Sequence, residues 1–139
     1  MRFLDSSTFL YAYLKPSTDP PPEVAHDKKV AQTIITRVNS GEQTLTTAAH
    51  ISEISNILES RTTQKEALTI TSSIIESENI KITPVDVVKI RNAVHIAERF
   101  YIGVNDGLAI NAMRENSLNE IYSRDKHFDN IPNKQRIWR

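Results

Sequence analysis

The chain has 139 residues, its 17 lysines and arginines are balanced by 17 aspartates and glutamates, and it contains no cysteine. This length is typical of one globular domain, so we expect a single domain over residues 1–139. The absence of cysteine excludes a disulfide scaffold, a thiol nucleophile, a cysteine-ligated zinc ion and an iron–sulfur cluster. A net charge of zero, taken alone, argues against a nucleic-acid partner, because such partners favour a basic surface.

The first half of the chain predicts helices that alternate with short strands. The expected elements are, in order, a strand at 3–4, a helix from Ser6, a proline-rich loop at 15–27, a helix from 26 or 27 to 40, a strand at 44–46, and helices at 48–59 and 64–78. Four prolines keep the loop extended, and its role stays open. The apolar run from Phe9 to Leu14 is too short for a secretory leader or a membrane span, so we expect a cytoplasmic protein without membrane contact.

The second half continues the alternation. The expected elements are a strand at 80–82, a helix starting at Pro84 with an apolar stripe of Val87, Ile90, Val94, Ala97 and Tyr101, a helix around 108–113, and strands at 121–122 and 136–138. Strands that alternate with helices indicate an α/β fold with a mostly parallel sheet.

Four carboxylates lie where such a fold builds a site. Asp5 and Asp125 each follow a strand, and ligands of parallel sheets gather beyond the carboxyl ends of the strands. Glu53 lies at the margin of the apolar arc of its helix. Asp106 lies in a first helical turn beside apolar neighbours, although an acid there also complements the helix dipole without any further role.

Carboxylates that converge on one pocket repel one another unless a cation balances them. Hard oxygen ligands of this kind suit Mg²⁺ or Mn²⁺. One or two such ions activate water and stabilise the charge that develops on a phosphodiester. The four acids therefore point to metal-dependent phosphodiester hydrolysis.

Four short segments carry a resemblance to a known family. They are RFLDSS at 2–7, ISEI at 51–54, NDGLAINA at 105–112 and SRDKHF at 123–128. In this order and spacing the chain resembles the PIN domain family, and most closely the single-domain VapC-type ribonuclease toxins of prokaryotic toxin–antitoxin pairs. The resemblance implies a three-layer α/β/α sandwich with a central, mostly parallel sheet of four or five strands.

The resemblance also implies the site and the activity, an endoribonuclease that uses Mg²⁺ or Mn²⁺. The implied metal ligands are Asp5, Glu53, Asp106 and Asp125. Ser123 matches the family's hydroxyl residue two places before the last acid, where it orients a water molecule or the neighbouring carboxylate. Asp129 is either a further acid near the metal or part of a surface turn. Setting the four ligands aside leaves 13 acidic residues against 17 basic ones, so a neutral total does not exclude RNA.

The implied partners are an RNA substrate, a cognate antitoxin and a second copy of the chain in a homodimer. Two alternatives stay open: an interaction module with weak or lost nuclease activity, and an RNA-processing nuclease outside a toxin–antitoxin pair. An apolar groove near Phe9, Tyr13 and Ile57 is the expected dock for an antitoxin. The basic residues offered for RNA contact, or only for solubility, are Arg124, Lys126, Lys134, Arg136 and Arg139.

The four histidines, His26, His50, His95 and His127, lack the close spacing of a zinc site. We expect each of them at the surface or partly buried.

Overall fold

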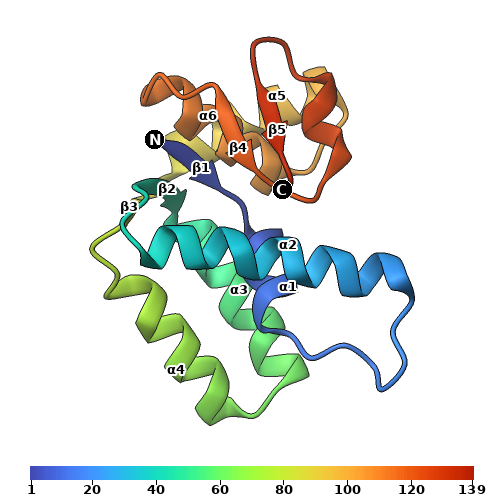
Figure 1. Cartoon of the computed structure of the whole chain (residues 1–139). Coiled ribbons are helices and arrows are strands. Elements are labelled where there is room, and N and C mark those ends of the chain that lie inside the picture. The colour runs from blue at the N-terminus through green and yellow to red at the C-terminus, as the bar shows by residue number, and fades with distance from the viewer.

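Five short strands form one parallel sheet at the centre of the computed structural model, which describes residues 1–139 (Figure 1). The strand order is β3-β2-β1-β4-β5, and each neighbouring pair is parallel. The strands are β1 (Arg2–Leu4), β2 (Thr44–Thr47), β3 (Ile80–Thr83), β4 (Glu120–Tyr122) and β5 (Gln135–Ile137). The expected parallel sheet is therefore confirmed, with five strands.

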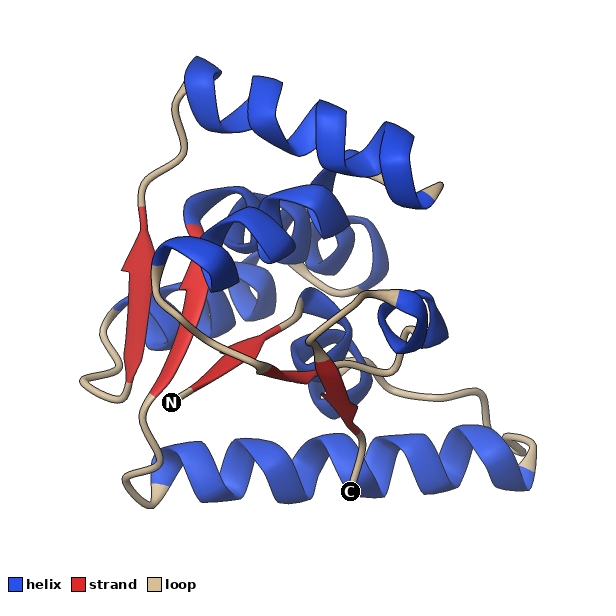
Figure 2. Ribbon diagram, turned by 90° about the horizontal axis from the view of Figure 1, so that it is seen from above, coloured by secondary structure: helices blue, strands red, loops and turns tan.

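Helices cover both faces of this sheet (Figures 1 and 2). They are α1 (Ser6–Tyr13), α2 (Pro22–Asn39), α3 (Ala48–Arg61), α4 (Gln64–Ile75), α5 (Val87–Phe100), α6 (Val104–Glu115) and the short 3₁₀ helix η1 (Lys126–Asn130). One hydrophobic core joins the sheet to α1–α4, and a second joins it to α5, α6 and η1. This arrangement confirms the three-layer α/β/α sandwich.

The central strand β1 supplies both cores. Phe3 and Leu4 are fully buried, Phe3 in the core on the α5 and α6 side and Leu4 in the core on the α1–α4 side. Adjacent strand residues point to opposite faces, so apolar residues are favoured at both positions of a strand that is buried on both sides. The pairing of Leu4 with Tyr122 of β4 then brings the next residues along each strand, Asp5 and Ser123, to the same edge of the sheet.

The proline-rich loop is shorter than predicted, because α2 begins at Pro22 rather than at 26 or 27. Pro22 occupies the first helical position, where the missing N–H has no intrahelical partner to lose. The loop therefore covers residues 15–21. The extra turn also places Asp27 inside α2, where it is 95% buried.

The prediction for α5 is wrong in its start and in its buried face. The helix begins at Val87, capped by Asp86, whose Oδ1 accepts from the Lys89 N–H at 2.9 Å. The side chains of Val87 and Tyr101 in the expected stripe are exposed, whereas Ala93 and Ile96 are buried. The spacing of apolar residues did not show which face of α5 is buried, because that face is determined by a close approach to α6.

This close approach involves Gly107 of α6. A Cβ atom built on Gly107 would lie 2.4 Å from the carbonyl oxygen of Ala93. Small residues on both helices let the backbones meet, and this contact sets the rotation of α5 about its axis. The glycine is thus a packing requirement of the α5–α6 pair.

A similar difference occurs in α4, which ends at Ile75 rather than at 78. Ala67 and Ile74 are buried there, while the expected apolar pair, Leu68 and Ile75, is exposed. None of the helices is both long and apolar enough to cross a membrane.

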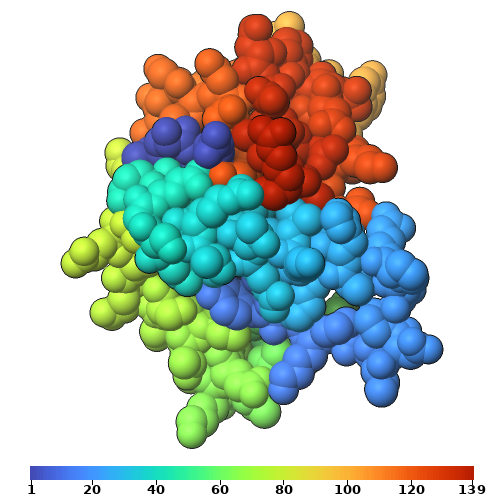
Figure 3. Space-filling view, in the orientation of Figure 1, coloured from blue at the N-terminus to red at the C-terminus, as the bar shows by residue number.

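The C-terminal residues lie against α2 (Figure 3). Arg37 of α2 donates from Nη1 to the carbonyl oxygen of Arg139 at 2.7 Å, and Trp138 donates from Nε1 to Oδ1 of Asp27 at 2.7 Å. Residues 138 and 139 are therefore held against α2.

Candidate active site

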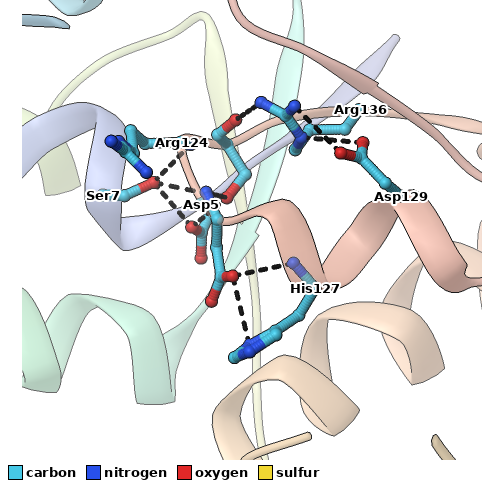
Figure 4. Close-up of polar contacts among 8 residues, drawn as sticks. Asp5, Ser7, Arg124, His127, Asp129 and Arg136 are labelled. Carbon is cyan, nitrogen blue, oxygen red and sulfur yellow. Dashed lines mark hydrogen bonds and ion pairs between the residues drawn. The ribbon is translucent and has the colours of Figure 1, made fainter.

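Asp5 follows β1 directly and is held by two hydroxyl groups. Ser7 and Ser123 each donate to its Oδ2 at 2.7 Å (Figure 4). The residue is only 6% exposed, so these bonds fix a buried carboxylate. Its second oxygen, Oδ1, accepts no hydrogen bond, and its negative charge is available to a ligand.

Ser7 and Ser123 also tie the turn after β4 to this carboxylate. Oγ of Ser123 accepts the N–H of Asp125 at 3.0 Å, and Oγ of Ser7 accepts the N–H of Arg124 at 3.1 Å. Ser123 thus contacts the carboxylate of Asp5, in line with one of the two roles expected for it. Ser7 was read only as a helix-start residue, and its place two residues after Asp5 is the signal that could have identified it.

Asp106 and Asp125 come together with a histidine that the sequence analysis did not select. One ligand atom from each of Asp106, Asp125 and His127 lies within 4.8 Å of the other two. Oδ1 of Asp125 accepts the His127 N–H at 2.9 Å and lies 3.1 Å from the ring Nδ1 (Figure 4). Asp125 caps the short helix η1 through this contact, so one residue closes a turn and presents a carboxylate.

The pKa of Asp106 reflects its burial and the acids near it. Burial, and then the negative charges of Asp5 and Asp125, raise the pKa of Asp106 from 3.8 to about 6. Only a hydrogen bond from the backbone of Gly103 and the charge of His127 oppose this rise. No lysine or arginine compensates the three carboxylates, as expected where a cation is to be bound.

These residues fit a divalent cation. Three carboxylates and an imidazole supply mostly hard oxygen donors, and the oxygen of Asp5 that faces away from the serines is free of hydrogen bonds. Burial raises the pKa of Asp106 most, and the charges of Asp5 and Asp125 add to the rise; a bound divalent ion would offset those charges.

Glu53 lies beside this cluster rather than within it. It is half-buried on α3 and lines a shallow hollow together with Asn105, the residue that precedes Asp106. Its charge acts on the His50 imidazole, as does that of Asp5. The structure thus brings Asp5, Asp106 and Asp125 together and places Glu53 at the rim.

His50 is fully buried, so the expectation that all four histidines lie at or near the surface is wrong. Its Nδ1 lies 2.7 Å from Oγ1 of Thr47, and its Nε2 lies 3.8 Å from Oδ1 of Asp5. Burial lowers the pKa of His50 despite the opposing charges of Asp5 and Glu53, which keeps the ring neutral. Its position four residues before the buried Ile54 was the available signal.

Asp129 pairs with Arg136, apart from Asp5 in the close-up (Figure 4). The guanidinium donates to both carboxylate oxygens, at 2.8 and 3.0 Å, and this contact lowers the pKa of Asp129. Of the two readings of Asp129, the geometry favours the surface turn. Among the basic residues suggested for RNA contact, Arg124 and Arg136 are both held by carboxylates, while Lys126 is exposed.

An apolar groove lies between α1, the proline-rich loop, α2 and α3. Its residues are Leu10, Tyr11, Leu14, Lys15, Pro16, Val24, Lys28, Ile57 and Arg61. Ile57 lines the groove as expected, but Phe9 is buried in the core and Tyr13 lies outside this groove. Lys28 donates to the carbonyl oxygens of Ala12 and Leu14, at 3.0 and 2.8 Å.

The PIN domain family model matches residues 2–134, and the chain therefore belongs to the PIN domain family. This match covers every residue of the site described above. A comparison with curated protein sequences found no significant match.

Solved structures with the same fold include VapC toxins. VapC20 of Mycobacterium tuberculosis, a toxin that cleaves the sarcin-ricin loop, shares 16% identity, with 91% of each chain covered and a TM-score of 0.72. A chain of a toxin–antitoxin complex from Klebsiella pneumoniae shares 10%, covering 97% of this chain and 96% of that one, with a TM-score of 0.63. A chain of VapBC2 from Rickettsia felis, bound to a promoter DNA fragment, shares 11% identity. The match covers 98% of this chain and 96% of that one, with a TM-score of 0.65.

Proposed function

We propose that this chain is a metal-dependent endoribonuclease that hydrolyses RNA phosphodiester bonds, and that it is the toxin of a toxin–antitoxin pair. The observation that carries the proposal is the meeting of Asp5, Asp106 and Asp125 at one edge of the sheet without a lysine or arginine paired to any of them. Family membership supports the same chemistry, because PIN nucleases generally use divalent metals.

The proposed metal ligands are Asp5, Asp106 and Asp125, with Glu53 at the rim and the ion being Mg²⁺ or Mn²⁺. When bound, such an ion lowers the pKa of water and offsets negative charge on the phosphate. The protein's own contribution is to hold the carboxylates in place. Ser7 and Ser123 fix one oxygen of Asp5 and leave the other for the ion. The pKa of Asp106, about 6, leaves its carboxylate ionised at neutral pH, so it would be available as a ligand.

The cleavage assay for this proposal uses defined RNAs with Mg²⁺, Mn²⁺ or EDTA. The sarcin-ricin loop, which the M. tuberculosis neighbour cleaves, is one RNA to include. We expect endonucleolytic cleavage with either metal and none with EDTA. Cleavage that persists in EDTA would contradict the metal-dependent mechanism.

We also propose that an antitoxin occupies the apolar groove between α1, α2 and α3. The groove presents Leu14, Val24 and Ile57, and Lys15 and Arg61 lie on its lining, a combination suited to an apolar segment that carries acidic residues. Two of the structural neighbours come from toxin–antitoxin assemblies. The test measures binding of the protein encoded by an adjacent reading frame. If that protein does not bind the wild-type chain, the proposed partner loses its support. If it binds the wild type but not Ile57→Asp, the groove is its binding site.

A homodimer belongs to the same proposal. Val87, Val88 and Tyr101 on or next to α5 expose apolar surface that a second copy could cover. Light scattering of the purified chain measures the mass directly, and a monomer at micromolar concentration would contradict a stable dimer.

The second candidate function is a PIN-fold interaction module with weak or lost nuclease activity. The groove favours it, because it would bind a partner whether or not the acids hold a metal. An RNA-processing nuclease outside a toxin–antitoxin pair would share the acids but lack the partner. Metal titration distinguishes the interaction module from the nuclease, because only the nuclease needs a metal ion. An adjacent reading frame that encodes a binding partner distinguishes a toxin from an RNA-processing nuclease.

A further inference from the structure

The buried imidazole of His50 has one nitrogen with no hydrogen-bond partner. The side chain is 1% exposed, and Nε2 contacts no acceptor within hydrogen-bond distance. Leaving a buried polar atom unpaired destabilises the folded state. An apolar side chain of similar size would avoid this cost, so packing alone does not explain the residue.

The partner on the other side of the ring determines which nitrogen carries the proton. Oγ1 of Thr47 accepts the backbone N–H of His50 at 3.2 Å and lies 2.7 Å from Nδ1. The Thr47 hydroxyl has no other acceptor, so it donates to Nδ1 and leaves the proton on Nε2. The opposite tautomer would leave that hydroxyl proton unused and turn the lone pair of Nε2 toward the carboxylate of Asp5.

The surroundings hold this ring in place. Phe3 packs edge-on against it, with the ring centres 5.1 Å apart and the planes at 72°. Thr47 is also the N-cap of α3, so the hydroxyl that orients the ring belongs to the end of β2. The Nε2–H group therefore faces Asp5 from a fixed position, 3.8 Å from Oδ1.

We propose that His50 is a positioning residue for the metal site: its Nε2–H faces Oδ1 of Asp5 across 3.8 Å and, through its dipole, stabilises the ionised carboxylate in the orientation that the cation would use. This inference rests on the proposed metal-dependent function. Ser7 and Ser123 fix Oδ2, and His50 supplies the only donor directed at Oδ1. A neutral donor stabilises the ionised carboxylate without neutralising it, whereas a lysine or arginine there would compete with the ion. Such supporting contacts are commonly worth 10–100-fold in metal affinity, as an order of magnitude.

The test compares two substitutions of His50 that fill similar volumes. His50→Met removes the donor, and His50→Gln offers an amide N–H near the position of Nε2. Mn²⁺ affinity is measured by electron paramagnetic resonance, together with thermal unfolding without metal. We expect His50→Met to bind Mn²⁺ about tenfold more weakly while remaining folded, and His50→Gln to recover most of the affinity.

A second pair of variants tests the tautomer without changing His50. Thr47→Ser keeps the hydroxyl, and we expect it to keep wild-type affinity. Thr47→Val removes the donation to Nδ1, and we expect it to weaken Mn²⁺ binding. The ring ¹⁵N resonances of His50 report the tautomer directly, with the proton expected on Nε2. This pair and the resonances decide the question if His50→Met does not fold.

The outcomes separate this inference from the function on which it rests. Equal Mn²⁺ affinity in the wild type and His50→Met, or a proton on Nδ1, overturns the role of His50 while the nuclease proposal stands. A wild type that binds Mn²⁺ no better than Asp5→Asn contradicts the metal site itself, and the role of His50 falls with it. A purely structural His50 would instead lower the melting temperature and leave Mn²⁺ affinity unchanged.

Discussion

Arg124, in the turn after β4, donates from Nε to Oδ2 of the buried Asp27 of α2 at 3.0 Å. The other oxygen of Asp27 accepts from the indole of Trp138 at 2.7 Å. One carboxylate therefore joins α2, the C-terminal residues and the turn that carries Ser123 and Asp125. Because the Arg124 N–H also donates to Ser7, this link reaches one of the two serines that hold Asp5.

Removing this link should destabilise the protein. Asp27→Ala leaves the Arg124 guanidinium and the Trp138 indole without their buried acceptor, and we expect a loss of about 2–4 kcal/mol in the free energy of unfolding. Glu23→Gln is the matched control, because exposed Glu23 binds the same guanidinium at 2.8 Å and should cost less than about 1 kcal/mol. Denaturant unfolding measures both, and equal losses would contradict a special role for Asp27.

Gly107→Ala should destabilise the contact between α5 and α6. The new methyl group would lie 2.4 Å from the backbone oxygen of Ala93, which cannot move without shifting the helix. We expect a loss of about 1–3 kcal/mol, the range for overpacked cores. At Gly103 the added Cβ meets only Oδ2 of Asp106, at 3.8 Å, so Gly103→Ala should cost less. A Gly107→Ala variant as stable as the wild type would contradict the packing described for this helix pair.

The pH dependence of the free energy of unfolding should reveal the raised pKa of Asp106. The pKa of Asp106 is raised from 3.8 to about 6 in the folded protein, so the folded state binds a proton that the unfolded state has released between these values. This group therefore contributes stability below about pH 4 and loses that contribution as the pH rises through about 6.

Without metal, Asp106→Asn should accordingly be more stable than the wild type at pH 7.5, by about 1–2 kcal/mol after allowance for solvent screening. The difference should vanish near pH 4. Mn²⁺ should reverse the order at pH 7.5, because only the wild type retains all three carboxylates. An Asp106→Asn variant that is less stable than the metal-free wild type at neutral pH would show that the carboxylates do not repel one another.

The two serines beside Asp5 should differ in importance. Ser123 is fully buried, and its hydroxyl joins Asp5 to the Asp125 N–H, whereas Ser7 is half-buried. We expect Ser123→Ala to weaken Mn²⁺ binding more than Ser7→Ala. Each hydroxyl accepts one backbone N–H, but water can replace the half-buried hydroxyl of Ser7 more easily than the fully buried one of Ser123. Calorimetric titration with Mn²⁺ measures the difference, and an equal or reversed order would contradict this account of Ser123.

Much of the fold follows from local patterns. Each strand was predicted within one residue of its observed bounds, because short apolar runs between segments of helical periodicity are typical of strands. The errors occur where tertiary packing determines which face of a helix is buried. Periodicity suggested that Val87 and Tyr101 of α5 are buried, but the contact between Ala93 and Gly107 turned that helix the other way.

The site divides in the same way. The rule for parallel sheets selected Asp5 and Asp125, which each follow a strand. Asp106 follows no strand and was selected from its apolar neighbours in a first helical turn and from the family resemblance. His50 and Ser7 were missed because a histidine or a serine in a first helical turn has many ordinary roles. Only the packing of α3 against β1 shows that His50 faces the carboxylate.

The most direct test of the central claim compares RNA cleavage by the wild type, Asp5→Asn and Asp129→Asn in Mn²⁺. Both substitutions remove one negative charge, but Asp5 faces Asp106 whereas Asp129 pairs with Arg136 on the surface. We predict that Asp129→Asn cleaves at close to the wild-type rate and that folded Asp5→Asn is at least about 100-fold slower, the order of effect expected when a metal ligand is lost. Cleavage by Asp5→Asn at the wild-type rate would contradict a metal site built on these carboxylates.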